Sequence, residues 1–279
     1  MSFWKTLQHR TFFWTFVLLA AYLVYIYPIQ RLTDWLNYPA LLNLPTIVGL
    51  WLLVTTVLRL SFRSSSRKLE LILYNWMGIG FVFFCLCFIY ELLRLGLALD
   101  DYWAGIGILI AGACITIFAL ATAQRLSCKQ LEFRDPKLTR KYRLVQISDV
   151  HIGSRSVGFL RYVVETINTQ NPDLIVITGD FLDAKRVQAE DIAPLKNLKA
   201  PVYFSIGNHE RYAGLDWVIP LLEDAGVVVL RSQAVKVGEL QLIGIDDAED
   251  KNQVRRELAK IELDPECFKI LLYHRPLGW

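Results

Sequence analysis

Four long segments without a charged residue constrain this chain more than any other feature of its sequence. They cover residues 11–30, 35–58, 71–90 and 102–124, and each approaches the ~20 apolar residues that a helix needs to cross a bilayer core. Buried helices of a soluble protein are the alternative, but such helices rarely run so far without a charge. A cleaved signal peptide does not fit the first segment, which is rich in bulky aromatic residues and lacks a small-x-small cleavage site. We therefore expect residues 1–124 to form a four-helix transmembrane region.

The positions of Lys and Arg predict how this region lies in the membrane. Basic residues precede the first segment, lie between the second and third, and follow the fourth, whereas the other two loops hold only Arg31 and Arg94. Because short cytoplasmic loops carry an excess of Lys and Arg, all three basic regions are expected on the cytoplasmic side. The sequence thus predicts a multi-pass protein of a bacterial cytoplasmic membrane, with everything after the fourth segment facing the cytoplasm.

A basic linker, residues 125–141, follows the fourth segment. Its charge is either an ordinary topology signal or a means of holding the downstream domain near anionic lipid headgroups. Since the basic residues flank apolar segments and do not alternate with stacking aromatic side chains, we expect membrane lipids but no nucleic acid as partners. The five cysteines show neither zinc-site nor disulfide spacing. The sequence leaves the oligomeric state open.

From residue 142 onward, short apolar runs alternate with amphipathic stretches. The runs predict strands at residues 144–147, 174–178, 202–206, 227–230, 234–237, 240–245 and 268–273. The stretches between them predict helices at residues 158–170, 189–198, 214–225 and 251–260. Alternation of this kind favours an α/β domain with a largely parallel sheet, and the closely spaced strands after residue 227 favour a second, more antiparallel sheet.

Polar side chains able to bind a metal follow four of the predicted strands. They are Asp149, His151, Asp180, Asn208 and His274. The carboxyl ends of parallel strands meet at one edge of a sheet, so these side chains are expected to converge. Residues 149 and 151 are two positions apart and would point the same way from an extended segment. Each site alone also fits a turn or a helix cap, but together they suit Mn, Fe or Zn and predict metal-assisted hydrolysis of a phosphate ester.

Taken in order, these motifs resemble the calcineurin-like metallophosphoesterase superfamily. The resemblance covers residues 143–279 and is carried by Gln146-Ile147-Ser148-Asp149-Val150-His151, Thr178-Gly179-Asp180-Phe181-Leu182-Asp183, Gly207-Asn208-His209-Glu210 and Leu272-Tyr273-His274. With the apolar segments ahead of it, the chain is similar to the family described as transmembrane protein with metallophosphoesterase domain. The resemblance implies a two-sheet αββα metallophosphoesterase domain over residues 142–279.

The resemblance also implies a site with two divalent metal ions. Asp149 and His151 would bind the first ion, Asp180 would bridge both, and Asn208 and His274 would bind the second.

Two further residues would carry the catalytic chemistry by the same resemblance. His209 would contact the phosphate and protonate the leaving oxygen, and Asp183 would orient His209. An imidazole titrates near neutral pH and therefore suits a general acid.

The sequence departs from the family pattern at its end. That pattern closes with a Gly-His-x-His motif, and no histidine follows His274. We therefore expect the phosphoesterase domain of this chain to be incomplete at its carboxyl end and to bind metal weakly, with one imidazole fewer on each ion.

The expected function is that of a membrane-anchored dinuclear-metal phosphoesterase acting on a phosphodiester or pyrophosphate bond. A lipid-linked nucleotide such as UDP-2,3-diacylglucosamine of lipid A synthesis is one candidate substrate. A soluble phosphate ester, with the membrane serving only as an anchor, is a second. A non-catalytic membrane sensor or scaffold is the alternative from a different class.

Overall fold

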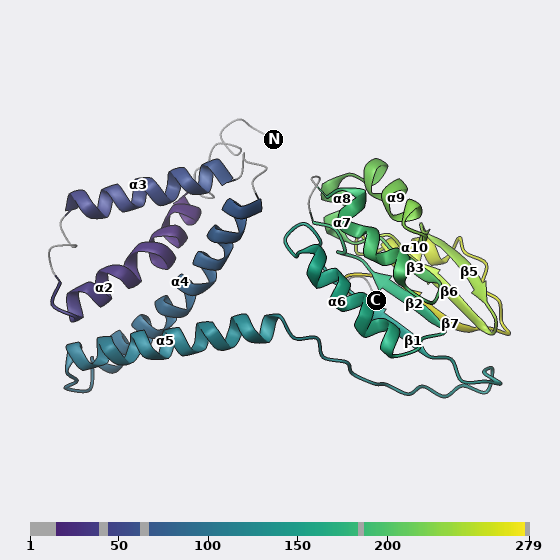
Figure 1. Cartoon of the computed structure of the whole chain (residues 1–279), viewed down its shortest axis with the longest axis horizontal. Helices are drawn as coiled ribbons and strands as arrows, with labels where there is room; N and C mark the ends of the chain where they lie inside the picture. The colour runs from purple at the N-terminus through teal and green to yellow at the C-terminus, as the bar shows by residue number, and fades with distance from the viewer. Residues whose placement is uncertain (1–14, 39–43, 62–66, 184–186, 277–279) are drawn as a thin grey trace. The chain divides into compact units, whose positions relative to one another are not determined.

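The computed structural model describes residues 15–38, 44–61, 67–183 and 187–276. The chain divides into two compact units, residues 1–127 and residues 128–279. Figure 1 labels the helices and strands of both units.

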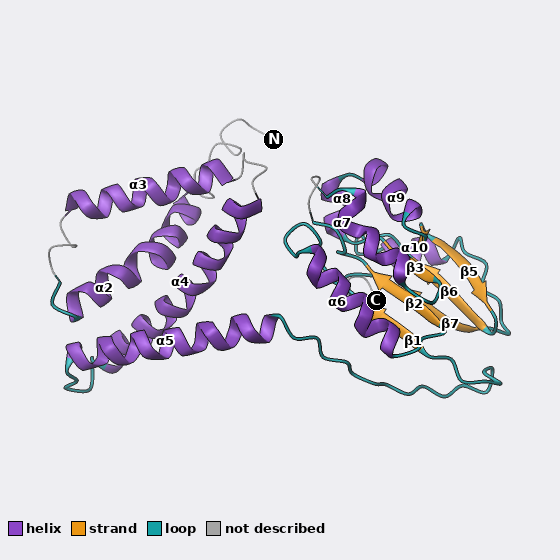
Figure 2. Cartoon of the chain, in the orientation of Figure 1, coloured by secondary structure: helices purple, strands orange, loops and turns teal. Residues whose placement is uncertain are grey.

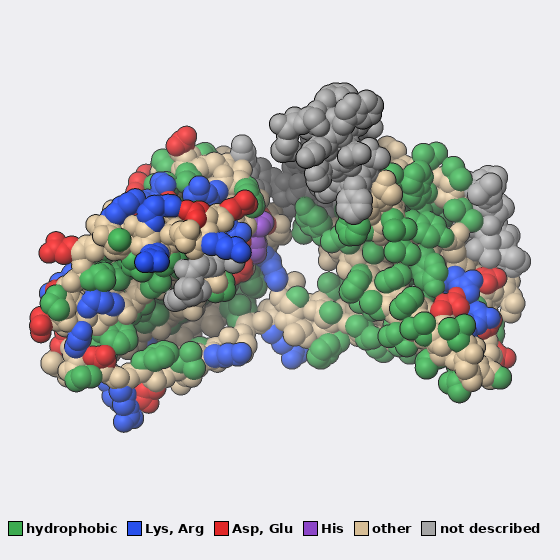
Figure 3. Space-filling view, turned by 180° about the vertical axis from the view of Figure 1, so that it is seen from behind, with side chains coloured by type: hydrophobic (Ala, Val, Ile, Leu, Met, Phe, Trp, Pro, Cys, Tyr) green, Lys and Arg blue, Asp and Glu red, His purple; other side chains and the backbone are tan. Residues whose placement is uncertain are grey.

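The first unit consists of apolar helices. They are the helix Thr15–Trp35, which contains a π-helical turn η1 (Tyr22–Ile26) and α2 (Tyr27–Trp35), then α3 (Leu44–Ser61), α4 (Arg67–Leu93) and α5 (Asp101–Ala123). Within the described residues, three helices are long and apolar enough to cross a membrane: Thr15–Trp35, Leu71–Leu93 and Asp101–Ala123. The apolar helix within α3, Thr46–Val57, is shorter. Hydrophobic side chains dominate the visible surface of this unit in Figure 3, as expected of a membrane protein.

The first helix extends past the predicted end of its apolar segment at residue 30. Trp35, which the sequence assigned to the second segment, ends this helix and is 2% exposed in a cluster that includes Tyr90. Arg31 is tolerated in the same helix because it forms an ion pair with Glu91 of α4. The first helix therefore ends later than local hydropathy predicted, because Trp35 packs against other helices and Arg31 is paired with Glu91.

The second unit begins with a parallel sheet. Its strands are β1 (Leu144–Ile147), β2 (Leu174–Thr178), β3 (Val202–Ser205) and β4 (Val227–Leu230), in the spatial order β1-β2-β3-β4. The connections are α6 (Val157–Thr169), α7 (Ala189–Ile192) with the 3-10 turn η3 (Ala193–Asn197), and α8 (Asn208–Ala213) with α9 (Leu215–Asp224). These helices lie on one side of the sheet in Figure 2. The parallel sheet predicted from the alternating pattern is thus confirmed.

A second sheet packs against the other side of the first. Its strands are β5 (Gln233–Val237), β6 (Leu240–Gly244) and β7 (Phe268–Leu272). The pair β5–β6 is antiparallel, but β6–β7 is parallel because the connection through α10 (Gln253–Leu258) crosses back over the sheet. The second sheet is therefore mixed, and the predicted antiparallel character holds for its first pair of strands only.

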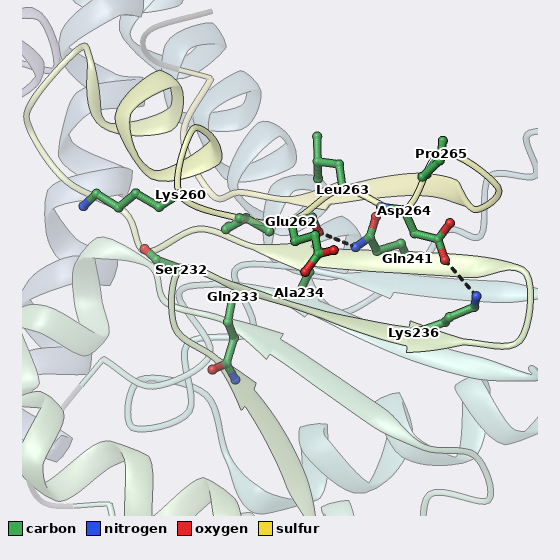
Figure 4. Close-up of a pocket in the computed structure, with 11 residues that line it drawn as sticks. Ser232, Gln233, Ala234, Lys236, Gln241, Lys260, Glu262, Leu263, Asp264 and Pro265 are labelled. Carbon is green, nitrogen blue, oxygen red and sulfur yellow. Dashed lines mark hydrogen bonds and ion pairs between the residues drawn. The ribbon is translucent and has the colours of Figure 1, made fainter.

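The segment after α10 covers the outer face of the second sheet. The Gln241 side chain of β6 donates to the Glu262 carbonyl at 2.8 Å and accepts from the Asp264 N–H at 3.0 Å. Lys236 of β5 forms an ion pair with Asp264 at 2.8 Å (Figure 4). The segment is thus bonded to the second sheet, and the domain has the layered α/β architecture expected from the sequence.

The core between the sheets places the end of β2 at the centre of the domain. Leu174 and Val176 of β2 pack against residues of the second sheet, including Leu242 and Leu272, and all five residues of β2 are buried. A strand that is covered on both faces has a continuous apolar sequence, as β2 does. The polar residues that follow β2 therefore emerge where both sheets and the loop after β3 meet.

Candidate metal centre

The loops that carry the candidate ligands leave the first sheet through left-handed backbone conformations. Asp149 has a φ of 55°, His151 of 52° and Asp180 of 52°. The prediction that residues 149 and 151 lie in an extended segment is therefore wrong. Asp and His tolerate this region better than most residues. The conformation is held by bonds between the loops, in which the Asp149 N–H donates to Gly179 O at 3.3 Å and the His151 N–H to Asp180 O at 3.1 Å.

Three candidate ligands converge in spite of this difference. One donor atom each from Asp149, His151 and Asp180 lies within 4.8 Å of the other two. The His151 Nε2 atom is 3.8 Å from Asp149 Oδ1. Asp149 is exposed and Asp180 is buried, so the group has one open side and one closed side. Two carboxylates and an imidazole at this spacing fit a borderline divalent cation.

His274 approaches Asp180 from the second sheet. Its Nε2 atom is 3.1 Å from Asp180 Oδ2, and its Nδ1 atom is 2.9 Å from the Thr178 carbonyl oxygen. A carbonyl can only accept, so Nδ1 carries the proton and donates to it. While the ring is protonated, Nε2 also donates to Asp180; once Nε2 releases its proton, its lone pair is available to a cation while Nδ1 keeps its bond to the carbonyl, as is common in metal-binding histidines.

The contact between His274 and Asp180 shifts the pKa of both side chains. The hydrogen bond to Asp180 raises the pKa of His274 to about 9, against an opposing effect of burial. Burial raises the pKa of Asp180, but bonds from the His274 ring and the His209 N–H outweigh it, so this pKa lies below its ordinary value. The arrangement favours a negative Asp180, the state in which a carboxylate binds a cation.

His209 and Asn208 lie at the same sheet edge, at the start of α8. The backbone N–H of His209 donates to Asp180 Oδ1 at 2.9 Å, and the ring atom Nε2 of His209 is 3.9 Å from Asp180 Oδ2. The His209 ring lies edge-on to the His151 ring, with centroids 4.7 Å apart, and 37% of its side chain is exposed. Asn208 is the first residue of α8 and directly precedes His209. A group in this position can reach a substrate bound over the carboxylates.

Asp183 lies beside a different histidine from the one the resemblance implied. Its Oδ2 atom is 3.8 Å from His151 Nδ1, and its Oδ1 atom accepts from the Ser154 N–H at 3.0 Å. The expected partner was His209. With Asp183 on its Nδ1 side, His151 presents Nε2 toward Asp149, so the carboxylate is placed to orient a candidate ligand.

The role of Glu210 was not predicted from the sequence, although the motif Gly207-Asn208-His209-Glu210 ends in this residue. The Glu210 side chain is fully buried and accepts from the backbone N–H groups of Asp180, Phe181, Leu182 and Gly207 at 2.8–2.9 Å. Burial raises the pKa of Glu210 by more than these donors lower it. The available signal was the spacing, since a Glu three residues after a helix N-cap is typical of a capping box.

Two glycines allow the loops after β2 and β3 to touch. Gly179 has a φ of 81°, and a Cβ there would lie 2.7 Å from Gly207 Cα and 2.9 Å from His274 Cγ. A Cβ at Gly207 would overlap Asp180 Oδ1. Any larger residue at either position would push the candidate ligands apart.

A second buried carboxylate anchors the segment that carries His274. Asp247, which is 0% exposed, accepts from Arg275 Nε at 2.7 Å and from Arg275 Nη2 at 2.6 Å. The Asp247 N–H donates to Ile206 O at 3.0 Å, at the end of β3. The residue after His274 is thus tied to the loop that carries Asn208. Neither residue was singled out from the sequence, which gives no local signal of this pairing.

Comparison with known proteins agrees with this geometry. Residues 142–276 match the family model described as Calcineurin-like phosphoesterase. An uncharacterised metallophosphoesterase of Campylobacter jejuni is 29% identical over 157 residues, which cover 53% of this chain and 42% of that protein. The transmembrane protein with metallophosphoesterase domain of Danio rerio is 35% identical over 127 residues, or 41% of this chain and 29% of that protein.

A third relative has a name that specifies a reaction. The UDP-2,3-diacylglucosamine pyrophosphatase of Chlamydia muridarum is 34% identical over 95 residues, which cover 30% of this chain and 28% of that protein. This chain matches less than half the length of each of the three relatives. The family match, the converging candidate ligands and the apolar helices together show a membrane protein that carries a calcineurin-like phosphoesterase domain at residues 142–276.

Proposed function

We propose that this chain is a membrane-anchored, metal-dependent phosphoesterase that hydrolyses a phosphate ester or anhydride bond. The position of Asp180 carries the proposal. Its carboxylate belongs to the donor group with Asp149 and His151 and also lies 3.1 Å from His274 Nε2. A buried carboxylate between two sets of metal-binding atoms, one from each sheet, supports a role as the bridge between two cations.

The donor set fits two divalent ions, of which Mn, Fe and Zn are the candidates. Asp149 and His151 would hold the first ion, Asp180 both, and Asn208 and His274 the second. When bound, such a pair of ions supplies a water of lowered pKa and neutralises the charge of the phosphate.

The remaining roles fall to the groups around the ligands. The backbone carbonyl of Thr178 holds the tautomer of His274 by accepting from Nδ1, and the Asp183 carboxylate, 3.8 Å from His151 Nδ1, would orient that ring. His209 has its backbone N–H bound to Asp180 and its ring partly exposed, so it is assigned the protonation of the leaving oxygen.

The proposed substrate is a phosphodiester or pyrophosphate with a lipid portion, such as a lipid-linked nucleotide. Helices that span a membrane keep the site near lipid substrates, and the name of the Chlamydia muridarum relative specifies a lipid-linked nucleotide. The basic linker supports a site on the cytoplasmic face of a bacterial membrane, near anionic headgroups.

The test uses the full chain in detergent, loaded with Mn²⁺. Phosphate-ester cleavage is measured with bis(p-nitrophenyl) phosphate, UDP-glucose and UDP-2,3-diacylglucosamine, with Asp180→Asn as the matched inactive control. Faster cleavage of the lipid-linked compound than of UDP-glucose is expected. Equal rates for the two diphosphates would favour a soluble substrate. Mn²⁺ binding without cleavage of any of the three compounds would contradict the enzyme and favour a scaffold.

A further inference from the structure

We propose that Glu210 is a positioning residue of the metal centre, whose carboxylate sets the separation between the loop of Asp180 and the loop of Asn208. The inference rests on the proposed function, because it states how two of the proposed ligands are held. Glu210 lies in α8, is 0% exposed, and faces backbone donors from both loops. Its role would be to act through Asp180 and Asn208 rather than on substrate.

The loop after β2 directs three backbone N–H groups at the Glu210 carboxylate. Left-handed conformations at Gly179 and Asp180 turn the following N–H groups toward one side, in the manner of an anion-binding nest. Glu210 Oε1 accepts from Phe181 at 2.8 Å and from Leu182 at 2.9 Å, and Oε2 accepts from Asp180 at 2.9 Å. These buried donors would otherwise be unsatisfied, which is costly.

The same carboxylate also reaches the loop after β3. Glu210 Oε2 accepts at 2.9 Å from the N–H of Gly207, which is the N-cap residue of α8. One oxygen atom therefore bonds both to Asp180, a proposed ligand, and to Gly207, which directly precedes the proposed ligand Asn208. A displacement of this oxygen would move the two ligands relative to each other.

An amide cannot replace this carboxylate. Its two oxygens accept four N–H bonds, two on each oxygen. In Glu210→Gln, one of these oxygens becomes an NH₂ group that faces two donors and can accept from neither. The substitution keeps the size of the side chain and removes half of the bonds, so it should loosen the two loops without emptying the core.

The experiment compares three forms of this chain in detergent: the unaltered chain, Glu210→Gln, and Asp246→Asn as the matched control. Asp246 is also a buried carboxylate, bonded to Arg231 at 2.6 Å, and lies outside the ligand loops. Mn²⁺ binding is titrated by electron paramagnetic resonance, urea unfolding gives the folded fraction, and hydrogen exchange reports on the loops and on β2.

Glu210→Gln is expected to bind Mn²⁺ about 10- to 100-fold more weakly per folded molecule, the size of effect typical of residues that orient ligands. Exchange should accelerate at residues 179–183 and 207–209 and stay unchanged within β2. Asp246→Asn should keep the Mn²⁺ affinity of the unaltered chain, whatever it does to the unfolding midpoint. A role confined to stability would lower the folded fraction of Glu210→Gln without changing the affinity of the molecules that remain folded.

Two results would overturn the proposal. One is an Mn²⁺ affinity of folded Glu210→Gln equal to that of the unaltered chain. The other is a loss of protection in β2 as large as in the loops, because Glu210 would then support the whole fold. If the unaltered chain takes up no Mn²⁺, the proposed function fails instead, and the exchange pattern alone decides: selective loosening of both loops supports the positioning role, and unchanged exchange excludes it.

Discussion

Asp180 is the residue through which most contacts of the candidate site pass. Its carboxylate accepts from the His209 N–H, lies 3.1 Å from His274 Nε2, and belongs to the donor group with His151. Its own backbone N–H is held by Glu210. The chemistry and the architecture of the candidate site therefore both depend on Asp180.

Substitution of Asp180 should consequently be more damaging than substitution of Asp183. Asp180→Asn removes the charge between the two donor sets, while Asp183→Asn only changes the group beside His151. Asp183→Asn should cost about 10- to 100-fold in metal affinity or rate, and Asp180→Asn more than that. Metal content by mass spectrometry and initial rates would measure both. Similar losses in the two variants would argue against a bridging role for Asp180.

His209→Ala should separate catalysis from metal binding. The ring of His209 is partly exposed, and only its backbone N–H bonds to Asp180, which Ala retains. Turnover should fall by about 10²- to 10⁴-fold, the usual contribution of a general acid, with metal content near that of the unaltered chain. Loss of metal from His209→Ala would show that His209 is a ligand.

The pKa of His274 predicts a pH dependence once metal is removed by a chelator. Because the hydrogen bond to Asp180 raises this pKa from 6.5 to about 9, the folded domain binds the proton more tightly than the unfolded chain. The stabilisation is complete below pH 6.5 and is lost as the pH rises through about 9. Urea midpoints of the chelated protein should fall over this range, and His274→Gln should flatten the fall. An unchanged slope in His274→Gln would assign the effect to another group.

At the scale of elements, the site depends on how closely two loops pack. The loop after β2 and the start of α8 meet at Gly179 and Gly207, where no side chain separates the backbones. Helix α8 was not expected from the sequence, because its six residues are too few to show a periodic pattern. The bonds of Glu210 to both loops account for the stability of so short a helix.

Gly179→Ala should therefore destabilise the domain and weaken metal binding together. The new Cβ would lie 2.7 Å from Gly207 Cα. The alanine would also have to adopt a φ of 81°, a conformation that residues with a side chain rarely adopt. Strain of this kind costs about 1–3 kcal/mol in unfolding free energy. Gly158→Ala in α6 is the control, since its Cβ would meet only Ser156 Oγ at 3.6 Å. Equal unfolding midpoints for the two variants would contradict the close contact.

At the scale of the whole molecule, a helical membrane unit precedes a layered α/β unit in the chain. The membrane unit is held by buried aromatic contacts and by ion pairs at helix ends, such as Arg94 with Asp101 at 3.3 Å. The α/β unit is held by the apolar layer between its two sheets. Each unit thus has its own source of stability.

The predicted orientation can be tested with Cys128, which is exposed and lies just after α5. A variant that retains only this cysteine should react with a membrane-impermeant maleimide in inverted vesicles and not in intact cells, because the basic linker favours the cytoplasmic side. Cys128→Ser in the same background gives the background signal. Labelling of Cys128 from outside intact cells would contradict the predicted cytoplasmic orientation.

Much of the fold could be predicted from the sequence because strands and helices leave patterns among residues that are close in the chain. The predicted strands at residues 144–147, 174–178 and 227–230 coincide with β1, β2 and β4, since each is an apolar run between polar or turn-forming residues. The parallel character of the first sheet followed from the alternation of strands and helices. Converging candidate ligands followed from polar residues placed directly after strands.

Contacts between distant residues decided the rest. Glu210 bonds to Asp180 across 30 positions, and His274 to Thr178 across 96, so neither pairing leaves a periodic signal in the sequence. The left-handed backbone at Asp149 is likewise held by a bond to Gly179, and the parallel pairing of β7 depends on a crossover. The sequence by itself determined which residues form the strands and which can bind a metal. Only the tertiary structure decided which carboxylate faces which histidine, because that depends on how two sheets pack.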